Sequence, residues 1–144
     1  RCSVEARLVR AYIATCPGRT TEGLFPLALG YVAADTGLTE EVISKALMEL
    51  EEAHIIEWDH KRQYVLDLEG LEVVNMTAEN DNRVRGAITQ LRGLGDTPLK
   101  ASLLRLADRY SPVLASAIRG SLPGFRPERS VTDIHGWAKN SETN

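Results

Sequence analysis

The sequence predicts a mostly α-helical protein with a small β-wing, and three observations lead to this fold class. Two short helical segments are separated by a turn of about three residues that contains Gly37. Two runs rich in β-branched and aromatic residues follow, which is the pattern of a β-hairpin. Beyond residue 82, Thr97-Pro98 and Ser111-Pro112 each join a capping residue to a proline, a signal for the start of a helix. Together they predict a winged helix-turn-helix followed by a helical C-terminal part.

Helix-capping and helix-breaking residues predict the first elements of the chain. Ser3 is a good N-cap for a first helix, which ends at the helix-breaking sequence CPG over residues 16–18. The run LFPL has room only for a short strand, and Pro26 keeps that strand at a sheet edge. Residues 27–35 then read as a compact helix. The apolar stripe expected on the first helix is Val4, Leu8, Tyr12 and Ile13.

The second helix of the turn motif is predicted to begin after Thr39, with Glu40 and Glu41 in the first turn where the helix dipole favours negative charge. The runs HIIEW and QYVLDL, joined by DHKR, predict a hairpin centred on residues 59–62. One helix face is expected to be buried and to hold Val42, Ile43, Ala46, Leu47, Leu50 and Ala53. The predicted core adds Leu8, Tyr12, Leu29, Val32, Ile55, Val65 and Leu66.

The chain is expected to divide into a winged helix-turn-helix domain over residues 1–74, a C-terminal helical region over 75–122 and an extended or poorly ordered tail over 123–144. Within the second part, helices are predicted over 82–94, 98–110 and 112–122. Their apolar residues are interpreted first as core and second as the interface of a homodimer. These residues are Leu99, Leu103, Leu104, Leu106, Ala107, Val113, Leu114, Ala117 and Ile118.

Composition and motifs argue against several classes of function. No apolar run approaches the 18 residues of a membrane span, so no membrane partner is expected. Cys2 and Cys16 are placed in one helix about four turns apart and so cannot pair, which favours a reducing cytoplasm. The histidines are scattered, so neither a metal nor another cofactor is expected. There is no phosphate-binding loop, dinucleotide-binding loop or nucleophile elbow, and we expect no enzymatic activity.

Charge is distributed unevenly along the chain. Residues 1–75 contain 7 Lys and Arg against 13 Asp and Glu, a balance of −6, whereas residues 76–144 contain 10 against 7, a balance of +3. If the chain binds nucleic acid, the later part should therefore supply more of the attractive field.

Three short motifs are similar to those of a known family. They are Gly23-Leu24-Phe25, the turn Asp35-Thr36-Gly37-Leu38, and LEEAHIIE over residues 50–57. In this order they resemble the N-terminal winged-helix region of phage-encoded proteins related to DnaD-like replisome organisers and replication initiators. The resemblance covers about residues 4–70 and implies a DNA-binding domain that acts in phage or prophage replication or in transcription regulation. The residues that carry the resemblance are mostly core and turn residues, so the resemblance indicates the fold more strongly than the function.

The candidate ligand is duplex DNA, because the early residues of the second helix of such a motif face the major groove. The wing tip is expected to meet the backbone, and the next helix to add phosphate contacts. The candidate DNA-binding residues are Thr39, Glu40, Ser44, Lys45, Met48, His60, Lys61, Arg62, Arg83 and Arg85. Further affinity is expected from Arg7, Arg10, Arg19 and Arg92.

The alternative is a protein-interaction module that binds a replication or transcription protein through the acidic face of the winged helix. A balance of −6 over 75 residues would repel DNA unless the acidic residues point away from it. Glu49, Glu51 and Glu52 lie late in the helix and are interpreted as solvated side chains, while Glu40 and Glu41 are equally well explained by helix capping and by function.

Overall fold

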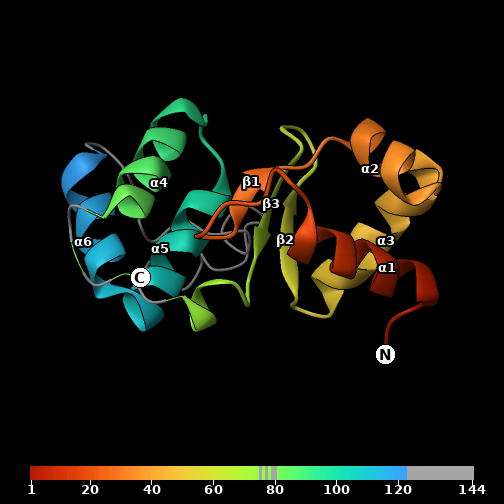
Figure 1. Cartoon of the computed structure of the whole chain (residues 1–144), viewed down its shortest axis with the longest axis horizontal. Helices are drawn as coiled ribbons and strands as arrows, with labels where there is room; N and C mark the ends of the chain where they lie inside the picture. Colours follow the sequence, from red (N-terminus) through yellow and green to blue (C-terminus); the bar gives the residue numbers. More distant parts are fainter. Residues whose placement is uncertain (75, 77, 79–80, 123–144) are drawn as a thin grey trace, which may run out of the picture. The chain divides into compact units, whose positions relative to one another are not determined.

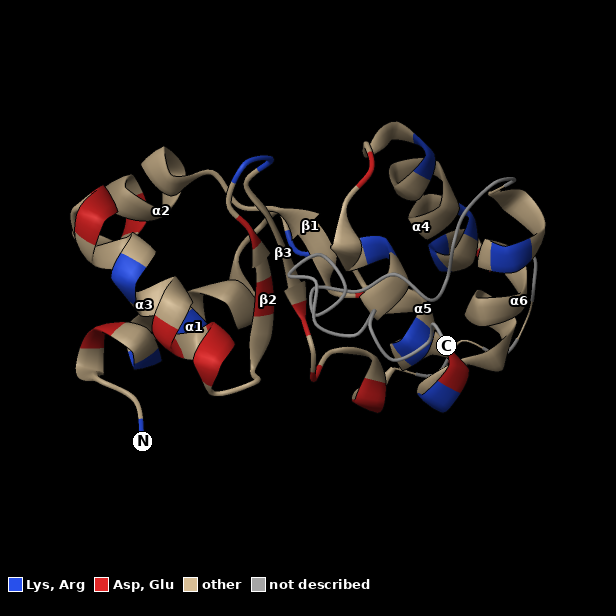
Figure 2. Cartoon of the chain, turned by 180° about the vertical axis from the view of Figure 1, so that it is seen from behind, with Lys and Arg blue, Asp and Glu red and all other residues tan. Residues whose placement is uncertain are grey.

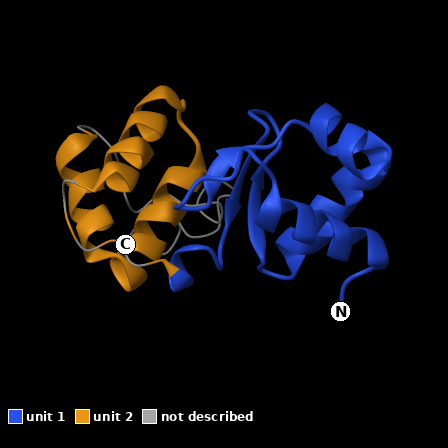
Figure 3. Cartoon of the chain, viewed as in Figure 1, with its two compact units in different colours: residues 1–73 blue, residues 74–144 orange. Residues whose placement is uncertain are grey.

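The computed structural model describes residues 1–74, 76, 78 and 81–122. The chain divides into two compact units, residues 1–73 and residues 74–144 (Figure 1, Figure 3). The tail predicted over 123–144 lies outside the described residues, as do residues 75, 77, 79 and 80 of the segment before the later helices.

The first unit has the element order of a winged helix-turn-helix, which is the fold class predicted (Figure 1). Its three strands are antiparallel in the order β1-β3-β2, so β1 is an edge strand, as its proline requires. The hairpin of β2 and β3 is the predicted wing. The elements are α1 (Val4–Thr15), β1 (Leu24–Pro26), α2 (Leu29–Thr36), α3 (Glu40–Glu52), β2 (Ile56–Asp59), β3 (Tyr64–Asp67) and a 3-10 turn (Leu71–Val73).

The turn between α2 and α3 is built from the residues that the sequence indicated. Gly37 has a φ of 80°, and its backbone N–H donates to the carbonyl of Ala33 at 2.9 Å, which closes α2. The Thr39 hydroxyl then accepts from the backbone N–H of Val42 at 3.2 Å and caps α3. Gly37, in the left-handed conformation, ends α2, and the capping residue Thr39 starts α3 two positions later. The axes of the two helices therefore point in different directions.

Gly37→Ala should lower the free energy of unfolding by about 1 kcal/mol, because a Cβ is disfavoured at positive φ even where there is space for it. Chemical denaturation measures the change. Gly18→Ala is the matched control, since Gly18 is exposed, has open space around it and is not at positive φ. Equal effects of the two substitutions would show that the turn does not depend on a left-handed residue.

The core of the first unit lies between one face of the sheet and helices α1, α2 and α3. Trp58 and Phe25 both pair with Val65 across the sheet, so all three side chains point to the same side, toward the helices. The predicted core is confirmed at Leu29, Val32, Ile43, Ala46, Leu47, Leu50, Val65 and Leu66, while Tyr12, Val42 and Ile55 are only half-buried. Ala53, predicted on the buried face of α3, is exposed because it follows the last turn of the helix as its C-cap.

The predicted stripe on α1 is confirmed at Ile13 but wrong at Val4 and Leu8. Leu8 is 43% exposed and Val4 is 67% exposed, whereas Ala6, Val9 and Ile13 are the buried residues. Both sets have helical spacing, so the sequence of α1 alone does not decide between them. The start of α1 also contacts α3, because Glu49 accepts from the backbone N–H and the hydroxyl of Ser3 at 2.6 and 2.8 Å.

The second unit contains three described helices, α4 (Asn82–Gly93), α5 (Pro98–Tyr110) and α6 (Pro112–Ser121), each within one residue of its predicted bounds. Thr97 caps α5 as predicted, but the Ser111 side chain makes no capping bond to α6. The apolar residues interpreted first as core are buried at Leu99, Leu103, Leu104, Ala107, Leu114 and Ile118, while Leu106, Val113 and Ala117 are half-buried. The homodimer stays a prediction.

Candidate nucleic-acid interface

Helix α3 presents one polar face to solvent. Its opposite face is fixed by four buried residues, so the rotation of the helix about its axis is well determined. Of the residues predicted to face DNA, Lys45 and Glu40 are exposed, and Met48 is 58% exposed. Ser44 is half-buried, and the Thr39 hydroxyl is engaged in the cap of its own helix.

Two of the late acidic residues of α3 are not simply solvated, which corrects the prediction. Glu49 holds the start of α1 through Ser3, and these hydrogen bonds lower the pKa of its carboxyl. Glu51 accepts from the backbone N–H of Trp58 at 3.3 Å, so it covers part of the edge of β2. Both carboxylates therefore point to neighbouring elements of the same unit, and Glu52 stays exposed.

The wing tip carries exposed basic residues, as predicted. His60, Lys61 and Arg62 are all exposed, and Figure 2 shows Lys and Arg together at the turn between β2 and β3. Asp59 organises this turn, because its carboxylate accepts from the backbone N–H of Arg62 at 3.0 Å and lies 3.5 Å from the Arg62 guanidinium.

Gln63 ties the wing tip to the helix-turn-helix and was not found from the sequence. Its side-chain oxygen accepts from the backbone N–H of Leu29 at 3.0 Å, in place of the missing side-chain cap on α2. Its backbone carbonyl accepts from the N–H of Leu27 at 2.8 Å, and its own N–H donates to the carbonyl of Asp59 at 2.8 Å. Gln63 has a φ of 55°, a conformation uncommon for a side-chain-bearing residue. The wing is thus anchored to the start of α2.

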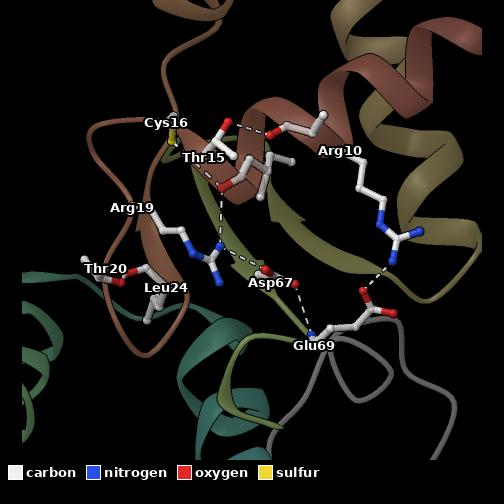
Figure 4. Close-up of polar contacts among 10 residues, drawn as sticks. Arg10, Thr15, Cys16, Arg19, Thr20, Leu24, Asp67 and Glu69 are labelled. Atoms are coloured by element: carbon white, nitrogen blue, oxygen red, sulfur yellow. Dashed lines mark hydrogen bonds and ion pairs between the residues drawn. The ribbon is translucent and has the colours of Figure 1, made fainter. Parts of the chain in front are cut away.

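Two arginines expected to add affinity are used inside the first unit (Figure 4). Arg19 lies 2.9 Å from the Asp67 carboxylate and donates to the carbonyl of Ile13 at 3.3 Å. Asp67 also accepts from the backbone N–H of Glu69, whose side chain lies 2.5 Å from Arg10. This network joins the end of α1 to the end of β3, so Arg19 and Arg10 stabilise the fold first.

The candidates Arg83 and Arg85 lie on α4, in the second unit. The Arg83 guanidinium bonds to the side chain of Asp81, and together with the bond from its backbone N–H this holds the pKa of Asp81 at about 2. Arg85 donates to the side-chain oxygen of Asn82, a neutral acceptor. Arg83 therefore forms an ion pair with Asp81, whereas Arg85 interacts with the Asp81 carboxylate more weakly and forms no ion pair with it.

The exposed charges of the winged-helix unit are of mixed sign. On α3, Glu40, Glu41 and Glu52 are exposed beside the single cation Lys45, a balance of −2. The cations of the wing tip lie beyond the helix, and Figure 2 shows more acidic than basic colour over the helices of this unit. The described cations that could attract a polyanion to this surface are therefore Lys45 on α3 and those of the wing tip.

No protein-family model, curated protein or solved structure matches this chain significantly. Among the described residues, no helix is long and apolar enough to cross a membrane, and no group of His, Cys, Asp and Glu side chains could hold a metal ion. Cys2 and Cys16 are free thiols that flank α1 rather than belonging to it.

Proposed function

We propose that this chain is a sequence-specific duplex DNA-binding protein of phage or prophage type that acts in replication or transcription regulation. The observation that carries the proposal is the exposed outer face of α3 beside a basic wing tip that Gln63 anchors to α2. This is the arrangement in which a helix enters the major groove while the wing meets the backbone. The proposal needs no cofactor and no catalytic step.

In this proposal Ser44, Lys45 and Met48 lie in the major groove. Lys45 donates to a guanine edge, and the Met48 side chain makes apolar contacts with the bases. Lys61 and Arg62 bind phosphates, and Arg62 exchanges its 3.5 Å contact with Asp59 for a phosphate oxygen. Because Glu49 and Glu51 point to α1 and β2, their charges do not face the groove.

The combined change Lys61→Ala and Arg62→Ala should weaken binding to all duplexes alike and reduce the slope of log affinity against log salt by about 2. Lys45→Ala should instead cost about 1–3 kcal/mol of binding free energy and relax the sequence preference, because it removes a contact to a base edge. Fluorescence titrations against specific and unrelated duplexes measure both. If both variants bind as the parent does, α3 and the wing are not the interface.

The second candidate function is a protein-interaction module that binds a replication or transcription partner. It is favoured by Met48 on α3 and by Tyr31 on α2, which is 75% exposed, because large exposed apolar side chains on a unit with exposed acidic residues are typical of a surface that binds a protein. A chain with this function would show no retention on duplex DNA even at low salt. Met48→Ala and Tyr31→Ala would then reduce binding to the partner protein.

We further propose that the chain binds DNA as a homodimer, since two half-sites multiply specificity. The proposal rests on this general property of the motif, because most of the apolar residues suggested for a dimer interface are core. Analytical ultracentrifugation of the full chain should show a dimer at high concentration. A monomer there would remove the dimer and leave the DNA-binding proposal intact.

A further inference from the structure

The second unit carries a charge opposite to that of the first. Residues 81–122 contain 7 Lys and Arg against 3 Asp and Glu, a balance of +4, whereas residues 1–74 contain 7 against 13, a balance of −6. A polyanion bound to this chain would therefore find most of its attraction in the second unit. The cations are spread over three helices. A phosphate contact needs exposed cations that lie on one helix face and form no ion pair with a neighbouring carboxylate.

Helix α4 has two arginines that meet both conditions. Arg85 and Arg92 are seven residues apart, which places them on the same helix face about 10 Å apart along the axis. Both are exposed, and among the described residues neither forms an ion pair, although the charge of the Asp81 carboxylate also acts on Arg85. Arg85 donates to the Asn82 side chain, and Arg92 donates to the carbonyl of Ser121 at 3.4 Å. The helix contains no Asp or Glu, and Figure 2 shows only basic colour along it.

A glycine directly follows each of these two arginines. Gly86 and Gly93 are also seven residues apart and exposed, and a Cβ built on either would have no atom within 4 Å. Neither has a positive φ, so neither packing nor backbone geometry requires glycine. Glycine is the least favourable helix residue after proline, and Gly86 lies inside the helix. Such a departure from helix propensity is expected where another molecule approaches the backbone closely.

We propose that the face of α4 formed by Arg85, Gly86, Arg92 and Gly93 is a second DNA contact, which binds the sugar-phosphate backbone of duplex DNA. The two guanidinium groups donate to phosphate oxygens, and the glycines let the backbone lie close to the helix. The contact carries no sequence information, because it reads phosphates rather than base edges. This inference rests on the proposed function for its ligand, but it concerns a different surface.

The combined change Arg85→Gln and Arg92→Gln in the full chain tests the proposal by titration against a duplex at two salt concentrations. Loss of two phosphate contacts makes the affinity of the variant less sensitive to salt than that of the parent. The ratio of parent affinity to variant affinity should therefore fall by about tenfold when the salt concentration rises from ~50 to ~200 mM. Gly86→Gln should weaken binding several-fold without lowering the melting temperature, because the side chain obstructs approach but suits a helix. Thermal melts of the same samples confirm that both variants are folded.

The matched control is Arg109→Gln, which makes the same change of charge in the same unit but on α5. Arg109 is exposed, and its guanidinium carbon lies 5.2 Å from the centroid of the Tyr110 ring. This variant should bind DNA as the parent does, and Ser116→Gln, at an exposed position of α6, should do the same. If Arg109→Gln and the double variant lose equal affinity per charge, only net charge matters and the α4 contact is refuted.

The wing variants test the winged-helix interface, and the α4 variants test the α4 contact, so the two proposals can fail separately. If the wing variants lose affinity while the α4 variants bind as the parent does, the winged-helix interface stands and the α4 contact falls. If only the α4 variants lose affinity, α4 binds DNA and the winged-helix interface falls. If the parent binds no duplex DNA at low salt but binds vesicles containing phosphatidylserine, both proposals are overturned.

Discussion

Leu47→Ala should lower the free energy of unfolding by about 2–5 kcal/mol, the largest effect we expect from a single substitution. Leu47 is fully buried on α3, within the cluster that joins α1, α2, α3 and the inner face of the sheet. Truncation removes buried methyl groups and leaves a cavity, since side chains from several elements surround the site and cannot all move into it. Urea denaturation followed by circular dichroism measures the change.

Leu8→Ala is the control for this prediction, because it makes the same chemical change on an exposed position. Leu8 is on the outer face of α1, so its truncation should change the free energy of unfolding by less than about 1 kcal/mol. A larger loss at Leu8 than at Leu47 would show that α1 packs with its other face inward, as the helix periodicity alone suggested.

Asp67→Asn should destabilise the first unit by about 1.5–3 kcal/mol, the range for hydrogen bonds to charged groups. The ion pair of Asp67 with Arg19 is largely shielded from water, with side chains 13% and 23% exposed (Figure 4). Asparagine keeps an acceptor for the backbone N–H of Glu69 but removes the charge that faces Arg19, whose guanidinium would stay partly buried. Denaturation at neutral pH measures the loss.

Glu69→Gln provides the comparison, since its partner Arg10 forms an ion pair that is about half exposed on both sides. Water and salt screen such a pair, so its loss should cost no more than about 1 kcal/mol. A double-mutant cycle on Arg19 and Asp67 isolates the coupling between them. Coupling no larger than that of Arg10 with Glu69 would contradict the structural role given to Arg19.

The fold was predictable where its signals are local. Gly37, Thr39 and the Thr97-Pro98 pair set the ends of helices through their own backbone preferences, and the structure has helix ends at each of them. The rotation of α1 was not predictable, because two sets of residues fit a helical stripe. The packing of Ala6, Val9 and Ile13 against core residues of α3 and the sheet, which are distant in the sequence, selects one of them. Pattern within a single element cannot contain that information.

The exposed residues of the candidate site were predictable from the sequence. The contacts that hold the wing and α3 in place were not. Lys45, Met48 and the wing-tip cations are exposed because helix periodicity and hairpin geometry put them outside. Gln63 gives no signal in the sequence, since its role depends on a left-handed backbone and on the start of α2, 34 positions earlier. The same is true of Glu51, whose partner is a strand edge. The number of acidic residues in α3 therefore overestimated the negative charge on its exposed face.

The most direct test of the central claim is a titration of the full chain against duplex DNA at ~50 and ~200 mM salt. Phosphate contacts by Lys61 and Arg62 alone predict binding at the lower concentration and a loss of about tenfold or more at the higher one, because each contact adds about 0.9 to the slope of log affinity against log salt. Absence of binding at ~50 mM salt, or an affinity that does not change with salt, would contradict the claim that this winged helix binds DNA.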